Sequence, residues 1–181
     1  FFGAMLVMAA YNLFILVFVR DLAYLYYIGT LVFFTLVQLK LTGYLYQYLQ
    51  PHLGAAFYRL NDVSLVVMGA SMLVFFLLFA REFLQTRIHT PRMHRVLNAV
   101  LILVLVHFAT SFLLPYRFGI SGVALLSVLS CLAFIGAGIA ALRAGVVKAR
   151  LYLAAWAVFV FGILVKALEA FGGLAPTAFT T

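Results

Sequence analysis

Two ionisable side chains, Lys166 and Glu169, stand three residues apart inside the last long apolar stretch of the chain. On a helix this spacing puts them on one face, where they can form an ion pair. Ionisable residues within a membrane span are costly and often contact a ligand or an ion. Near the end of a span, however, a lysine stem can reach the membrane surface by snorkelling. The pair is therefore a ligand or relay candidate, and the alternative is a structural pair at the membrane boundary.

Two further polar side chains, Asn12 and His107, lie within other apolar stretches. An imidazole can ligate haem or relay protons. A haem held by two histidines needs a second one at similar depth, but His52, His89 and His94 all fall between the apolar stretches. Polar side chains in hydrocarbon commonly bond to a neighbouring helix. We expect this of His107, keep both residues as secondary ligand or relay candidates, and predict no metal and no cofactor.

The remaining motifs do not indicate catalysis or nucleic-acid binding. The sequence contains no glycine-rich phosphate loop, no carboxylate pair and no nucleophile beside a base. We therefore expect no enzymatic activity within these 181 residues. The basic segment 81–95 lies beside apolar stretches, where arginines set topology and meet anionic lipid headgroups. Nucleic acid is not an expected partner.

The amino-acid composition indicates the class of protein in which these candidate side chains lie. Hydrophobic residues make up 67% of the chain and charged residues 9%, whereas soluble domains have about 45–50% and about 25%. The lone Cys131 cannot form an internal disulfide. These values exclude an ordinary soluble domain and predict an integral membrane protein with the lipid bilayer as its surroundings.

Six stretches reach the roughly 20 apolar residues that a helix needs to cross a bilayer. They predict an all-α, polytopic transmembrane helical bundle forming one domain over residues 1–181, with a long loop at 42–62 closed by Asn61-Asp62 as a helix cap. The small residues between Ala133 and Ala141 predict close packing of the fifth helix against a neighbour. That neighbour can belong to the same chain, so a homodimer is a candidate assembly that the pattern does not require. The predicted helices are 1–19, 22–41, 63–80, 96–114, 118–142 and 151–171.

The lysines and arginines between these stretches predict the orientation, because short basic loops stay in the cytoplasm. The first, third and fifth breaks hold eight of them and the opposite side three. Residue 1 and Thr181 are then extracytoplasmic. Because the chain begins at Phe1 within an apolar run, we expect that a segment before it is missing. Because an even number of spans leaves Thr181 outside, communication with the cytoplasm beyond the loops needs a seventh helix after it, so we expect truncation at both ends. The eight are Arg20, Arg81, Arg87, Arg92, Arg95, Arg143, Lys148 and Arg150.

A series of local patterns, in order along nearly the whole chain, resembles one known membrane module. The patterns are Tyr11-Asn12-Leu13, Arg20–Tyr27, Gly43–Pro51, Ala80–Leu84 with Pro91–Arg95, Leu114–Arg117, Ala149–Trp156 and the tail Leu174–Thr180. The module is that of the bacterial seven-transmembrane receptors with diverse intracellular signalling modules (7TM-DISM). Lys166 and Glu169 depart from the pattern, which has an aromatic and a basic residue there.

The resemblance implies a transmembrane sensor or relay module of a bacterial signal-transduction receptor in the inner (cytoplasmic) membrane. Its partners would be an extracytoplasmic sensor domain and a cytoplasmic signalling domain of the same polypeptide, such as a kinase or a cyclase. The alternative is a small-molecule or ion transporter, or a transporter-like membrane subunit, with Lys166, Glu169 and His107 along the substrate path. Against this alternative, the sequence has no internal repeat and no pair of broken helices.

Overall fold

In the computed structural model, the described residues form seven helices and no strand. It describes the backbone of residues 1–113 and 115–170, and the side chains of the same residues apart from 46, 49–62, 160 and 162–170. Backbone groups in hydrocarbon must be satisfied within the protein, which favours helices. The predicted all-α polytopic bundle is confirmed.

Six of the helices are long, and their apolar parts coincide closely with the stretches identified from the sequence. In the described part of the chain, five segments are long and apolar enough to cross a membrane: α1, α2, α5, α6 and residues Val63–Phe83 of α3. The sixth predicted span lies in α7, which is only partly described. The helices are α1 (Phe2–Val19), α2 (Leu22–Leu41), α3 (Tyr44–Phe83), α4 (Thr86–His89), α5 (Pro91–Thr110), α6 (Tyr116–Arg143) and α7 (Lys148–Ala170).

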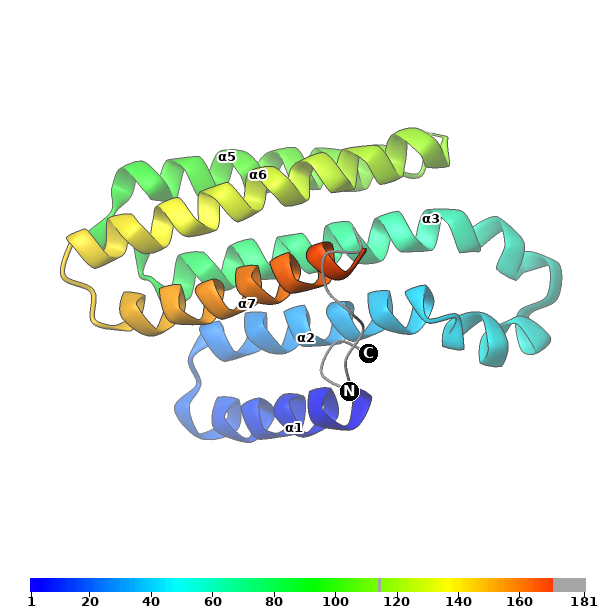
Figure 1. Cartoon of the computed structure of the whole chain (residues 1–181), viewed down its shortest axis with the longest axis horizontal. Helices are drawn as coiled ribbons and strands as arrows, with labels where there is room; N and C mark the ends of the chain where they lie inside the picture. The colour runs from blue at the N-terminus through cyan, green and yellow to red at the C-terminus, as the bar shows by residue number, and fades with distance from the viewer. Residues whose placement is uncertain (114, 171–181) are drawn as a thin grey trace.

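The prediction of a long loop at 42–62 is wrong, because α3 begins at Tyr44 and runs for 40 residues. Gly43 turns the chain with φ 80°, a left-handed conformation that suits glycine. The backbone is then helical through the expected cap at Asn61-Asp62. Hydropathy detects segments that can cross hydrocarbon, but it does not detect a helix that continues outside it. Figure 1 shows the ribbon of α3 changing direction before its long apolar part.

The third break is shorter than predicted and contains a helical turn of its own. α3 ends at Phe83, the one-turn helix α4 follows, and α5 begins at Pro91, five residues before the expected start. Proline favours the first position of a helix, where its missing N–H costs nothing. Gln85 turns the chain with φ 47°, and the Thr86 hydroxyl lies 3.0 Å from Nδ1 of His94, which joins α4 to α5.

The long helices run side by side along one axis of the molecule (Figure 1). α2 packs against both α1 and α3, and α3 also packs against α5 and α6. α7 packs against α6. α1 lies at the edge of the bundle and has no buried residue. The buried core is therefore formed by α3, α5, α6 and α7.

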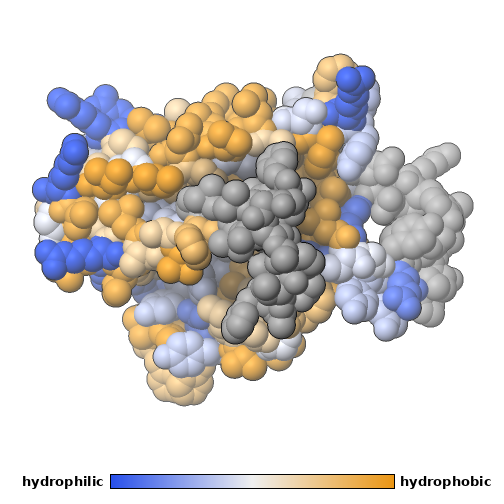
Figure 2. All heavy atoms as spheres, in the orientation of Figure 1, coloured by the Kyte–Doolittle hydropathy of each residue, from blue (hydrophilic) through white to orange (hydrophobic). Residues whose placement is uncertain are grey.

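The outer surface of the bundle is apolar between two more polar ends (Figure 2). Leu125 and Leu132 on α6, for example, are 72% and 64% exposed. Contiguous apolar surface of this kind indicates contact with a membrane. The chain is therefore a multi-pass membrane protein.

Glycines allow the helices to approach one another closely, as small residues do in other membrane bundles. A Cβ atom at Gly138 would lie 2.6 Å from Leu153 and 3.1 Å from Tyr152 on α7. A Cβ atom at Gly29 would collide with the ring of Phe75 on α3. The close packing predicted for the segment 133–141 is thus found within the chain, against α7.

Replacing Gly138 should therefore weaken the α6–α7 contact. We expect Gly138→Ala to destabilise the protein by about 1–3 kcal/mol, the usual cost of overpacking. Gly3→Ala is the matched control, because nothing lies within 4 Å of a Cβ atom there. Thermal unfolding in detergent, followed by the fluorescence of Trp156, measures both. Equal melting temperatures for the two variants would contradict the close contact.

Candidate functional site

Three aromatic rings from three helices meet at the centre of the bundle. Phe76 of α3 lies 4.8 Å from Phe134 of α6 and 5.3 Å from Trp156 of α7, measured between ring centroids. Phe134 and Trp156 are 5.2 Å apart. Phe134 is 1% exposed and Trp156 6%. These distances are within the favourable range for aromatic pairs, so the three rings join α3, α6 and α7.

Four more rings extend this contact toward one end of the bundle. Phe79 lies 5.2 Å from Phe83, and Phe83 lies 6.2 Å from Tyr152 of α7. Tyr27 of α2 lies 5.4 Å from Phe79. The rings thus connect α2, α3, α6 and α7. We call the seven residues Tyr27, Phe76, Phe79, Phe83, Phe134, Tyr152 and Trp156 the aromatic cluster.

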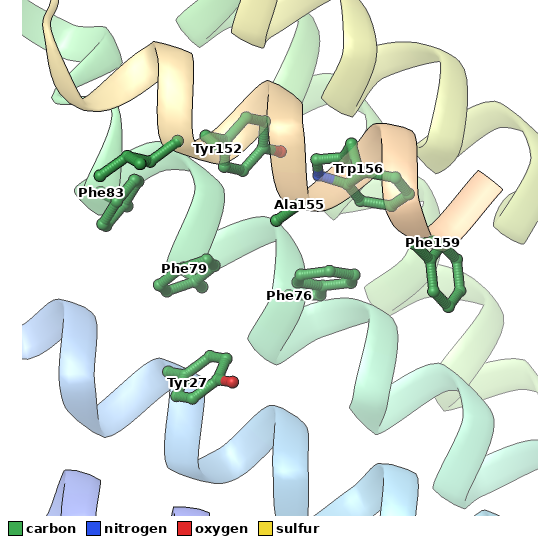
Figure 3. Close-up of a pocket in the computed structure, with 9 residues that line it drawn as sticks. Tyr27, Phe76, Phe79, Phe83, Tyr152, Ala155, Trp156 and Phe159 are labelled. Atoms are coloured by element: carbon green, nitrogen blue, oxygen red, sulfur yellow. The ribbon is translucent and has the colours of Figure 1, made fainter. Parts of the chain in front are cut away.

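The cluster borders a groove between α2, α3 and α7 with a volume of about 280 Å³ (Figure 3). Tyr27 forms one side of the groove, Phe76 and Phe79 its back, and α7 the other side. Ligand pockets in proteins usually measure about 300–1,000 Å³. The volume of the groove lies just below this range, which suits a slender group rather than a bulky ligand, and its walls are hydrophobic rather than ionic.

His107 joins α5 to α6. Its Nε2 lies 3.0 Å from the carbonyl oxygen of Gly119. A carbonyl only accepts hydrogen bonds, so Nε2 carries the proton and donates. A Cβ atom at Gly122 would collide with the imidazole ring, so this glycine makes room for it. This is the interhelical hydrogen bond expected for His107.

Asn12 bonds within its own helix. Its side-chain nitrogen donates to the carbonyl of Met8 at a distance of 2.8 Å. A contact between helices is instead made by Lys40, whose ammonium group donates a hydrogen bond to the hydroxyl of Ser64 on α3. The structure therefore does not bring Asn12 and His107 into one site, because they lie on α1 and α5.

The side chains of Lys166 and Glu169 lie outside the described residues. Their backbone belongs to α7, as expected for the last predicted helix. The tail after Ala170, including Thr181, is also outside the described part. Among the described residues, no group of three His, Cys, Asp or Glu side chains is placed to hold a metal ion.

The sequence interpretation did not find the aromatic cluster. Tyr27, which the sequence analysis did not select as a site candidate, packs on Phe79 of α3 and lines the groove. A pattern could have indicated part of the cluster. Phe76, Phe79 and Phe83 follow the three- and four-residue spacing of one helix face, as do Tyr152 and Trp156.

The fold and the apolar surface define the class: a polytopic helical membrane protein with an aromatic centre. Comparison with protein families then gives the family. The sequence model described as 7TM diverse intracellular signalling matches residues 1–181. The chain belongs to this family, and is thus a transmembrane module of receptor type. No curated protein and no solved structure matches the chain.

The aromatic contacts predict a large cost for removing the central ring. Phe134→Ala should destabilise the protein by about 3–5 kcal/mol, because it leaves a cavity beside Phe76 and Trp156. Leu132→Ala, on the outer face of the same helix, should change stability by less than about 0.5 kcal/mol. Unfolding in mixed micelles measures both values. Similar losses for the two variants would show that Phe134 has no special packing role.

Replacing His107, and so removing its hydrogen bond, should reduce the stability of the protein by a smaller amount. His107→Leu should cost about 0.6 kcal/mol and at most about 1.7 kcal/mol, the range measured for bonds between membrane helices. His107→Gln keeps a donor and should cost less. Asn12→Leu is the control, because Asn12 bonds within α1. A loss of several kcal/mol in His107→Leu, measured by the same unfolding assay, would indicate a role beyond one hydrogen bond.

Proposed function

We propose that the chain is the transmembrane relay module of a bacterial signal-transduction receptor. It couples an extracytoplasmic sensor domain to a cytoplasmic output domain of the same polypeptide. The observation that carries this proposal is the family match, which extends over all 181 residues. The module itself has no catalytic role, and the output reaction belongs to the cytoplasmic domain.

The aromatic cluster supports a mechanism for the relay. A ligand shifts a receptor between two conformations only if it binds them with different affinities. Packed interfaces favour such discrete states, because side chains interdigitate in one arrangement or another. Phe76, Phe134 and Trp156 form an interface of this kind among α3, α6 and α7. A change of rotamer or helix rotation there would move α3 and α7 together.

The charges at the helix ends support one orientation in the bacterial inner membrane. Arg20 follows α1, Arg81 lies near the end of α3, and Arg143 ends α6. Helices that alternate in direction bring these termini to the same end of the bundle (Figure 1). By the positive-inside rule this end is cytoplasmic. Residue 1 and Thr181 then face the outside.

Reporter fusions test this orientation. A fusion at Gly145, which lies between α6 and α7, should be active with a cytoplasmic reporter, and a fusion at Thr181 with an extracytoplasmic one. The reason is the excess of lysine and arginine at the α6–α7 end. An extracytoplasmic signal at Gly145 or a cytoplasmic one at Thr181 would reverse the proposed topology.

The sequence of the complete gene tests whether the chain is the relay module of a receptor. A kinase, cyclase or phosphatase domain encoded in the same reading frame supports the receptor. In that full-length protein, the conservative exchange Phe76→Leu should alter the output response to the stimulus, while Leu125→Ala on the outer face should leave it unchanged. A gene that encodes no signalling domain, together with substrate flux in proteoliposomes, would favour a transporter instead.

A further inference from the structure

The groove between α2, α3 and α7 lies at the basic end of the bundle. Tyr27 is the sixth residue of α2, and Phe83 is the last residue of α3. Leu151 and Tyr152 belong to the first turns of α7. The same end carries the lysine and arginine side chains of three inter-helix breaks. The apolar groove therefore opens into the membrane leaflet that faces the positively charged end.

Lys148 lies beside this groove, next to one of its lining rings. Its ammonium nitrogen lies 5.9 Å from the centroid of the Phe83 ring, which is a wall of the groove. This distance is within the range of a cation–π contact. The side chain is otherwise exposed, and no described carboxylate forms an ion pair with it. The groove is thus apolar along its walls and has one positive charge at the end that lies near the membrane surface.

An anionic phospholipid has the complementary arrangement, with a negative phosphate at the surface and an apolar chain beneath it. We propose that the groove binds one acyl chain of such a lipid, with the phosphate at Lys148. The lining of the groove matches hydrocarbon, because phenylalanine and leucine side chains make up most of its walls. Basic residues next to a membrane attract anionic headgroups. The inference depends on membrane insertion but not on the receptor function.

The chain contains a built-in probe for this site. Trp156 is the single tryptophan, and it lines the groove. It follows Lys148 by eight residues, which is about 12 Å along a helix. Bromine atoms in the middle of an acyl chain whose phosphate sits at Lys148 would reach the indole ring and quench its fluorescence.

The experiment places the 181-residue chain in phosphatidylcholine vesicles that contain increasing amounts of one brominated lipid. Brominated phosphatidylglycerol should quench Trp156 at a mole fraction about fivefold lower than brominated phosphatidylcholine, as expected for one basic residue at an anionic surface. Equal quenching by the two lipids would overturn the proposal. Absence of quenching by either lipid would mean that protein covers the groove, and would overturn it too.

Matched variants separate a specific site from general surface charge. Lys148→Gln should remove the preference for phosphatidylglycerol. Arg95→Gln removes the same charge at the same end of the bundle, at the start of α5, and should keep the preference. Equal losses in the two variants would assign the preference to general surface charge and overturn the proposal.

A second pair of variants tests the groove itself. Ala155 lines the groove and its neighbour Ala154 does not, although both are exposed. Ala155→Phe should fill the groove and raise the amount of brominated lipid needed for half-quenching, while Ala154→Phe should leave it unchanged. Unchanged quenching in Ala155→Phe would show that the lipid contacts Trp156 from elsewhere, against the proposal.

Discussion

Contact among Phe76, Phe134 and Trp156 is the interaction on which the bundle depends. Lipid tails are as apolar as leucine, so burial away from water does not hold membrane helices together. Shape complementarity and dispersion must do this instead. The three rings supply large contact surfaces at the point where α3, α6 and α7 meet. Gly138, one turn of α6 from Phe134, brings α7 close enough for the rings to touch.

The same constraint explains how much of the fold could be predicted from the sequence. Hydrophobic stretches long enough to span a bilayer give the number and order of the long helices. The start of α3 could not be found in this way, because the segment after Gly43 is helical without being a membrane span. Pro91 marks the start of α5 by its chemistry, but Arg92, His94 and Arg95 follow it, so the apolar stretch begins only at Val96.

Predicting the candidate site was harder, for a physical reason. In a soluble helix, polar residues mark the outer face and so fix which face is buried. Here both faces are apolar: Leu132 points outward and Phe134, two residues later, is buried. Hydropathy therefore cannot identify the inward face. The candidate residues predicted from the sequence were instead the polar side chains within the apolar stretches. Of these, His107 lies at a helix contact and Asn12 bonds within α1.

The position of α1 has a mechanical consequence. α1 buries no residue and packs along α2, and among the described residues its one ring contact with α3 is made by Phe2 on Tyr44, at the far start of that helix. It is therefore connected to the aromatic centre mainly in series, through α2 and then α3. Two joints connected in series share a displacement according to their stiffness, and the softer joint absorbs more of it. The α2–α3 joint is stiff, since Gly29 lets the Phe75 ring lie against the α2 backbone and Phe33 stacks on that ring at 5.5 Å. The α1–α2 joint is therefore the compliant element, and a pull on the first helix is taken up largely there before it reaches Trp156.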